Sequence, residues 1–211
     1  IVMINDKLKS NCNKLISETD ATISASRRVV LDELVLFIRE ELKASLSEGK
    51  EVSVVYLCTH NSRRSHFAQV WGHIASVLFD VKNLKTYSGG TVATECHPNT
   101  IAALKHIGFE IKCEDLSAAN PLYQVYYNDT DFIDCYSKAN TADSIPQTDF
   151  IAVMTCSDSD DNCPLVPGAK KRFSTTYDDP KEFDDSENPV PYYVERSLQI
   201  ASEILYTFQQ L

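Results

Sequence analysis

The chain has 211 residues, of which 43% are hydrophobic and 24% are charged, the proportions of an ordinary globular protein. The formal net charge of −10 argues against nucleic acid or an anionic membrane surface as the main partner. No stretch approaches the roughly 20 apolar residues of a membrane-spanning helix, and the apolar start is too short for a signal-peptide core. We therefore expect a cytoplasmic protein without a structural disulfide framework.

The first half of the chain begins with a polar segment, residues 1–24, that has no strong pattern. Apolar residues then recur at helical spacing and predict a helix over roughly 26–47, ended by Gly49. Residues 52–57 form a short β-branched apolar run, which is typical of a buried parallel strand. After an eight-residue polar loop, periodic apolar residues predict a helix over 67–78.

The second half continues the alternation of strands and helices. Residues 84–88 predict a strand, and Pro98 begins a helix that Gly108 ends. We expect residues 114–148 to be an elaborated loop with a short helix. Strands are predicted over 150–155 and 171–174, and an amphipathic helix over 192–211. Such alternation predicts an α/β fold, with a four-stranded parallel sheet covered on both faces and ligands bound beyond the strands' carboxyl ends.

One polar loop lies at such a strand end, from Cys58 to Ser65. Five residues between Cys58 and Arg64 can wrap their N–H groups around a tetrahedral anion, and the following helix N-terminus adds donors. Arg64 can bind two anion oxygens, and the donors favour a nucleophilic Cys58 thiolate. The spacing alone could arise by chance, but its place between strand and helix favours a site. The expected oxyanion-binding residues are Thr59, His60, Asn61, Ser62, Arg63, Arg64 and Ser65, with His60 and Arg63 as bystanders or local counter-charges rather than catalysts.

An acid is also needed, because displacement at Cys58 must protonate a departing oxygen. Asp179 precedes Pro180 in a polar loop, and the proline holds its neighbour extended. Without Cys58, this pair would be ordinary turn chemistry. Asp179 is therefore the candidate general acid.

Cys156 and Cys163 follow the later strand, on the same expected face. Six intervening residues permit a disulfide if this acidic, helix-poor segment loops out. The segment lacks the glycine and glutamate of a calcium loop and has no further soft ligands for zinc, so no metal is expected. The remaining cysteines are expected to be reduced and mostly buried: Cys12, Cys96, Cys113 and Cys135.

The loop from Cys58 to Ser65, together with Asp179 and Pro180, resembles the low-molecular-weight tyrosine phosphatase superfamily. The segment from Cys156 to Cys163 is similar to the redox segment of its thioredoxin-coupled arsenate reductases. The resemblance implies a flavodoxin-like three-layer domain over residues 51–211, with residues 1–50 as an N-terminal helical extension. It implies no cofactor.

The resemblance further implies a three-thiol relay. Cys58 attacks arsenate and Asp179 protonates the leaving hydroxide. Cys156 then attacks the Cys58 adduct and releases arsenite, and Cys163 attacks Cys156 to present a redox-active disulfide to thioredoxin. Such an enzyme would serve arsenical resistance.

The chain departs from the family pattern at several positions. His60 replaces the usual loop glycine, Arg63 the second cysteine, and Gln69 a glutamate from which some members build a potassium site. Lys181 replaces the tyrosine that grips phosphotyrosine, which weakens the alternative of a phosphotyrosine or phosphoarginine phosphatase. A non-catalytic module that only binds an anion is the third possibility.

Overall fold

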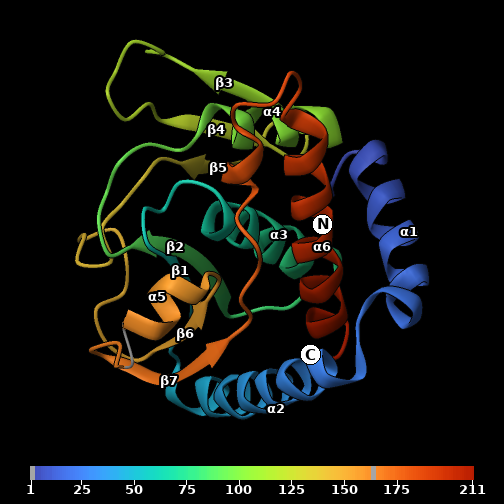
Figure 1. Cartoon of the computed structure of the whole chain (residues 1–211). Coiled ribbons are helices and arrows are strands. Elements are labelled where there is room, and N and C mark those ends of the chain that lie inside the picture. Colours follow the sequence, from blue (N-terminus) through green and yellow to red (C-terminus); the bar gives the residue numbers. More distant parts are fainter. Residues whose placement is uncertain (1–2, 163–164) are drawn as a thin grey trace.

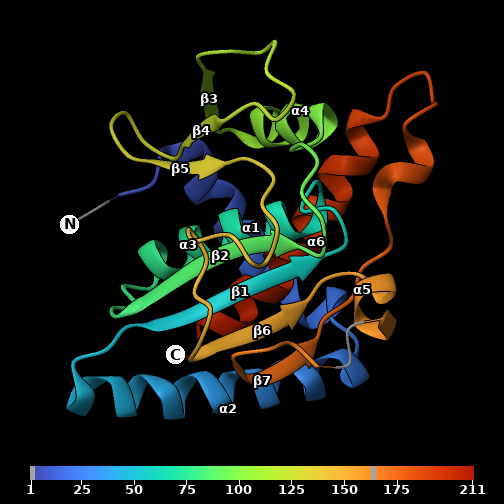
Figure 2. The same cartoon turned by 90° about the vertical axis from the view of Figure 1, so that its left-hand side faces the viewer.

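The computed structural model describes residues 3–162 and 165–211. Its centre is a parallel sheet of four strands in the order β2-β1-β6-β7, formed by β2 (Leu84–Gly90), β1 (Val52–Cys58), β6 (Phe150–Met154) and β7 (Ala169–Ser174). Figure 2 shows the four strands side by side, with β1 and β6 pointing toward α5 (Ser157–Asn162). The predicted α/β fold with four parallel strands is confirmed.

The helices cover the sheet through one large hydrophobic core. It joins β1 and β6 to α3 (Arg64–Leu78), α4 (Pro98–Ile107) and α6 (Val190–Phe208). Trp71 is fully buried there, and its indole N–H donates to Ser197 Oγ at 3.0 Å. A smaller cluster on Val55, Leu57 and Met154 packs against Ile145. The helices expected after the first and second strands and at the end of the chain are confirmed.

Two helices precede the sheet. Helix α2 (Ala25–Glu48) is the one predicted over 26–47, and it ends at Gly49 with φ of 65°. Helix α1 (Asp6–Thr22) was not predicted, because its buried stripe is narrow, with Leu8 and Cys12 as its buried residues. It packs along the outside of α6 (Figure 1), and both buried residues belong to the main core.

Residues 114–148 differ from the prediction of a loop with a short helix. They contain no helix, and two of their segments pair with the strand before them in an antiparallel sheet: β3 (Glu110–Cys113), β4 (Tyr123–Tyr126) and β5 (Phe132–Cys135), in the order β3-β4-β5. Each strand has four residues, too few for an alternating pattern to stand out. In Figure 2 this sheet lies beside α4 and above the parallel sheet.

The described chain has one further short element, the 3₁₀ helix η1 (Pro180–Phe183), which follows Asp179. No helix within residues 3–162 and 165–211 combines the length and apolar character needed to span a membrane.

Candidate active site

The loop from Cys58 to Ser65, which carries the candidate nucleophile, connects β1 to α3, as predicted. Cys58 is 5% exposed, and its sulfur accepts the backbone N–H of Asn61 at 3.2 Å. Ser65 Oγ lies 3.0 Å from the same sulfur and itself accepts from Asn61 Nδ2 at 2.9 Å. Because that contact occupies an acceptor position of Ser65, its hydroxyl proton can point to Cys58. Two donors therefore face the thiol.

The loop is held from behind by residues that the sequence did not reveal. Asn61 has a left-handed backbone (φ 45°), and its side-chain oxygen accepts the backbone N–H of Lys138 at 2.8 Å. Ser137 Oγ donates to His60 O at 2.8 Å. A Cβ at Gly90 would come within 2.7 Å of the backbone of Asn61, so only glycine allows β2 to pack this closely. The loop is thus preformed.

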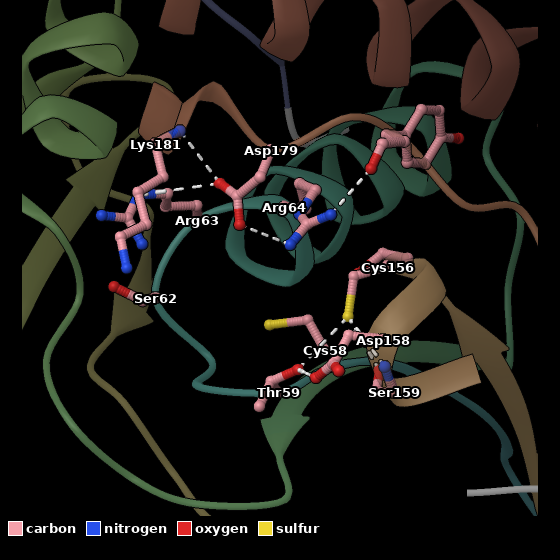
Figure 3. Close-up of polar contacts among 12 residues, drawn as sticks. Cys58, Thr59, Ser62, Arg63, Arg64, Cys156, Asp158, Ser159, Asp179 and Lys181 are labelled. Atoms are coloured by element: carbon pink, nitrogen blue, oxygen red, sulfur yellow. Dashed lines mark hydrogen bonds and ion pairs between the residues drawn. The ribbon is translucent and has the colours of Figure 1, made fainter. Parts of the chain in front are cut away.

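Arg64 and Asp179 meet at the mouth of the loop, as Figure 3 shows. Arg64 Nη2 donates to Asp179 Oδ2 at 2.6 Å, and Nη1 donates to Tyr177 O at 2.7 Å. Asp179 Oδ1 accepts the backbone N–H of Lys181 at 3.0 Å. A cavity of about 170 Å³ opens here, lined by Cys58, Thr59, His60, Ser62, Arg63, Arg64, Asp158, Asp179 and Lys181.

Cys156 lies beside this loop, at the start of α5. Its sulfur is 2.9 Å from Ser159 Oγ and 3.6 Å from the hydroxyl of Thr59, the neighbour of Cys58 in the chain. Thr59 also donates to Asp158 at 2.7 Å (Figure 3). The expectation of a helix-poor segment was wrong, since residues 157–162 form a short helix. Cys163 lies outside the described residues.

Arg63, expected to be a bystander or a local counter-charge, has specific partners in the structure. Its side chain is 12% exposed and reaches the loop that carries Asp179, where Nη2 donates to Asp184 Oδ2 at 2.8 Å. Nε donates to the hydroxyl of Tyr193, on α6, at 2.7 Å. These partners lie 121 and 130 residues away in the sequence, so spacing could not reveal them.

The other described cysteines lie away from this cavity, and three of them are buried. Burial raises the pKa of Cys12 and of Cys135 to about 12, and it also raises the pKa of Cys96 well above its ordinary value. Cys113 is half-buried. The residues described contain no group of three or more His, Cys, Asp or Glu side chains placed to hold a metal ion.

Comparisons with known proteins agree with this geometry. No family model matches the chain. A low-molecular-weight phosphotyrosine phosphatase from Vibrio cholerae O395 has a similar fold, with a TM-score of 0.51 at 15% identity over 74% of this chain and 93% of that one. "Arsenate reductase 2" of Staphylococcus haemolyticus is 30% identical over 128 residues, which cover 61% of this chain and 78% of the relative. The chain belongs to the family of this arsenate reductase, and its fold is that of a low-molecular-weight phosphotyrosine phosphatase.

A second arsenate reductase gives the same result. The "Arsenate reductase" of Staphylococcus aureus (strain N315) is also 30% identical over 128 residues, covering 61% of this chain and 78% of the relative. These relatives are enzymes, and this chain is an enzyme of the same family.

Proposed function

We propose that this enzyme reduces arsenate to arsenite through a relay of cysteines. The observation that carries the proposal is the position of Cys156, whose sulfur lies 3.6 Å from the Thr59 hydroxyl, directly beside the Cys58 loop. Phosphoryl transfer requires no second thiol at this place, whereas a reductase needs one within reach of the first. The names of the Staphylococcus relatives support the same activity.

In the first step, the Cys58 thiolate attacks arsenic(V), and one oxygen leaves as water after accepting a proton from Asp179. The N–H groups of residues 59–64, the Arg64 fork and the Ser65 hydroxyl are suited to hold the anion and the sulfur. The contacts of Cys58 with Ser65 and Asn61 support this assignment.

In the second step, Cys156 attacks the Cys58 sulfur, and the sulfur–arsenic bond breaks. The two electrons of that bond leave with arsenic, which departs as arsenite, and a Cys58–Cys156 disulfide remains. Cys163 then attacks Cys156 and frees Cys58. Thioredoxin, a dithiol protein, is the proposed reductant of the resulting Cys156–Cys163 disulfide, and a reducing cytoplasm is the compartment that fits this cycle.

A phosphatase acting through a Cys58 phosphocysteine is the second candidate. The pairing of Arg64 with Asp179 at the cavity mouth supports it. An arginine that binds the anion and an aspartate that protonates the leaving oxygen would serve phosphoryl transfer as well as they serve arsenate reduction. In either case we propose residues 51–211 as the catalytic domain and residues 1–50 as an extension of it.

The test is arsenate turnover with thioredoxin, thioredoxin reductase and NADPH, followed by mass mapping of disulfides. Serine substitution of Cys58, Cys156 or Cys163 should abolish turnover, whereas Cys113→Ser, the matched control, should retain it. Cys163→Ser should accumulate the Cys58–Cys156 disulfide. Wild-type turnover by Cys156→Ser or Cys163→Ser would refute the relay. The phosphatase would instead hydrolyse an aryl phosphate in a manner that needs Cys58 and ignores Cys156.

A further inference from the structure

Arg63 lies next to the anion-binding Arg64, yet its hydrogen bonds go to a different set of partners. We propose that Arg63 is a positioning residue, which fastens the loop of Asp179 to the nucleophile loop so that the acid stays over the bound anion. The inference rests on the roles proposed above for Cys58 and Asp179. It concerns what keeps these two groups together when a substrate enters.

The contacts of Arg63 join two parts of the chain that are far apart in the sequence. Its Nη2 donates to Asp184 Oδ2 at 2.8 Å, and its Nε donates to Tyr193 Oη at 2.7 Å. Asp179 Oδ1 is 3.9 Å from Nε. With only 12% of the side chain exposed, water screens these charges poorly, and the fork has a defined geometry.

Asp184 is a suitable anchor because it is held from several sides. Tyr193 donates to its Oδ1, Asn99 Nδ2 donates to the same atom at 3.2 Å, and His97 Nε2 lies 3.5 Å from Oδ2. Burial alone would raise the pKa of Asp184, but the Tyr193 hydrogen bond and the Arg63 charge outweigh it and lower the pKa. The carboxylate is therefore charged at neutral pH and belongs to a network that includes α4 and α6.

Because Asp184 and Asp179 lie at the two ends of the short helix η1, holding Asp184 in place also holds Asp179. Asp179 and Asp184 flank η1, whose first residue is Pro180, and Asp179 caps this helix through Lys181 N at 3.0 Å. Fixing one end of so short and stiff an element fixes the other.

Arg64 cannot provide the same support once substrate is present. Its Nη2 now donates to Asp179 at 2.6 Å, but an oxyanion in the loop needs that guanidinium. Asp179 then loses its strongest contact. Arg63 keeps its own partners, because they lie on Asp184 and Tyr193, outside the anion-binding loop.

The experiment compares wild type with Arg63→Gln by three measurements. Inorganic phosphate should protect Cys58 from iodoacetamide at a half-protecting concentration within about twofold of wild type, because the anion's ligands remain. Backbone amides of residues 178–186 should exchange hydrogen about tenfold faster in saturating phosphate. The rate of Cys58–Cys156 disulfide formation in a single turnover with arsenate should fall roughly 10- to 100-fold, because the acid is misplaced.

The matched control is Arg196→Gln, which removes another arginine paired with this loop, at 3.5 Å from Asp178. It should change none of the three measurements. Tyr193→Phe keeps the buried ring but removes one partner of Arg63, so it should shift exchange and rate in the same direction by a smaller factor. This milder variant decides the matter if Arg63→Gln does not fold.

Two results would overturn the inference. One is exchange in residues 178–186 that equals wild type in both Arg63→Gln and Tyr193→Phe. The other is a loss of phosphate protection as large as the loss of rate, which would make Arg63 an anion ligand. If wild type forms no disulfide with arsenate, the proposed function fails, while exchange and phosphate protection still decide the role of Arg63.

Discussion

Arg64 Nη2 donates to Asp179 Oδ2 at 2.6 Å, so the side chain suited to bind an oxyanion is already paired with the side chain suited to act as acid. Nη1 of the same guanidinium is bound to Tyr177 O at 2.7 Å. An incoming anion must therefore compete with Asp179 for Arg64. Binding would release the carboxyl at the place where the departing oxygen needs a proton.

Asp179→Asn should slow the chemical step without disturbing the loop. The asparagine can still accept the Lys181 N–H that Asp179 accepts at 3.0 Å, but it cannot supply a proton. The rate of Cys58–Cys156 disulfide formation with arsenate, followed by mass spectrometry, should fall by about 10²- to 10⁴-fold. The neighbouring Asp178→Asn is the control, since that side chain is 86% exposed. Equal rates for the two variants would remove Asp179 as the acid.

Lys181→Tyr should move the enzyme toward aryl phosphates. Lys181 lines the active-site cavity at a position where an aromatic ring could stack on an aryl leaving group. We expect the ratio of kcat/KM for phenyl phosphate to kcat/KM for arsenate to rise about 3- to 10-fold over wild type. This change corresponds to roughly 1 kcal/mol of stacking. Glu182→Tyr, one residue further along η1, controls for the added ring. An equal gain from both variants would contradict a specific role of position 181.

Leu8→Ala tests whether α1 stabilises the fold. Leu8 is fully buried in the main core, although it belongs to a helix outside α6. Removing its side chain should lower the free energy of unfolding by about 2–5 kcal/mol in urea denaturation. Leu46→Ala, at a position that is 75% exposed on α2, should cost less than about 0.5 kcal/mol. A similarly small loss for Leu8→Ala would show that α1 detaches before the core unfolds.

The buried His66 should make the free energy of unfolding fall as the pH is lowered into mild acid. Burial, with a smaller effect of the Lys138 ammonium, lowers its pKa from 6.5 to about 3. Between these values the unfolded chain binds a proton that the folded chain does not, so stability is present above pH 6.5 and is lost as the pH falls. From pH 7 to 5.5, wild type should lose about 1 kcal/mol more than His66→Gln in urea titrations.

The control for this pH effect is His106→Gln, at an exposed position near the end of α4. It should lose stability in parallel with wild type over the same pH range. If His66→Gln also follows wild type, the buried imidazole does not govern the acid response.

The strong periodic elements could be predicted from the sequence because their buried faces are wide. Strand β1 is buried at six of its seven positions, and α3 at ten of fifteen. Helix α1 has only two buried positions among seventeen residues, so its pattern was too weak to identify. In α5 the residues are Ser, Asp and Asn, which favour caps and turns over helix interiors, and its contacts with β1 and β6 prevail over that preference.

The residues of the site also differ in how far the sequence could predict them. Cys58, Arg64 and Ser65 lie within one local motif, so their proximity follows from a strand–loop–helix connection. Arg63 differs, because its partners are brought together only by the packing of η1 and α6 against the loop. The support of Asn61 by Lys138 comes from a segment whose structure the sequence did not indicate.

The deeply buried thiols affect which disulfides can form during the proposed thiol relay. Cys12, Cys96 and Cys135 are at most 1% exposed, and burial raises the pKa of each. Thiol exchange requires a thiolate that can reach the target sulfur. In the proposed relay, a disulfide that forms at Cys58 would therefore be kept from scrambling onto these three side chains, so a cysteine-rich chain could be oxidised repeatedly without random cross-linking.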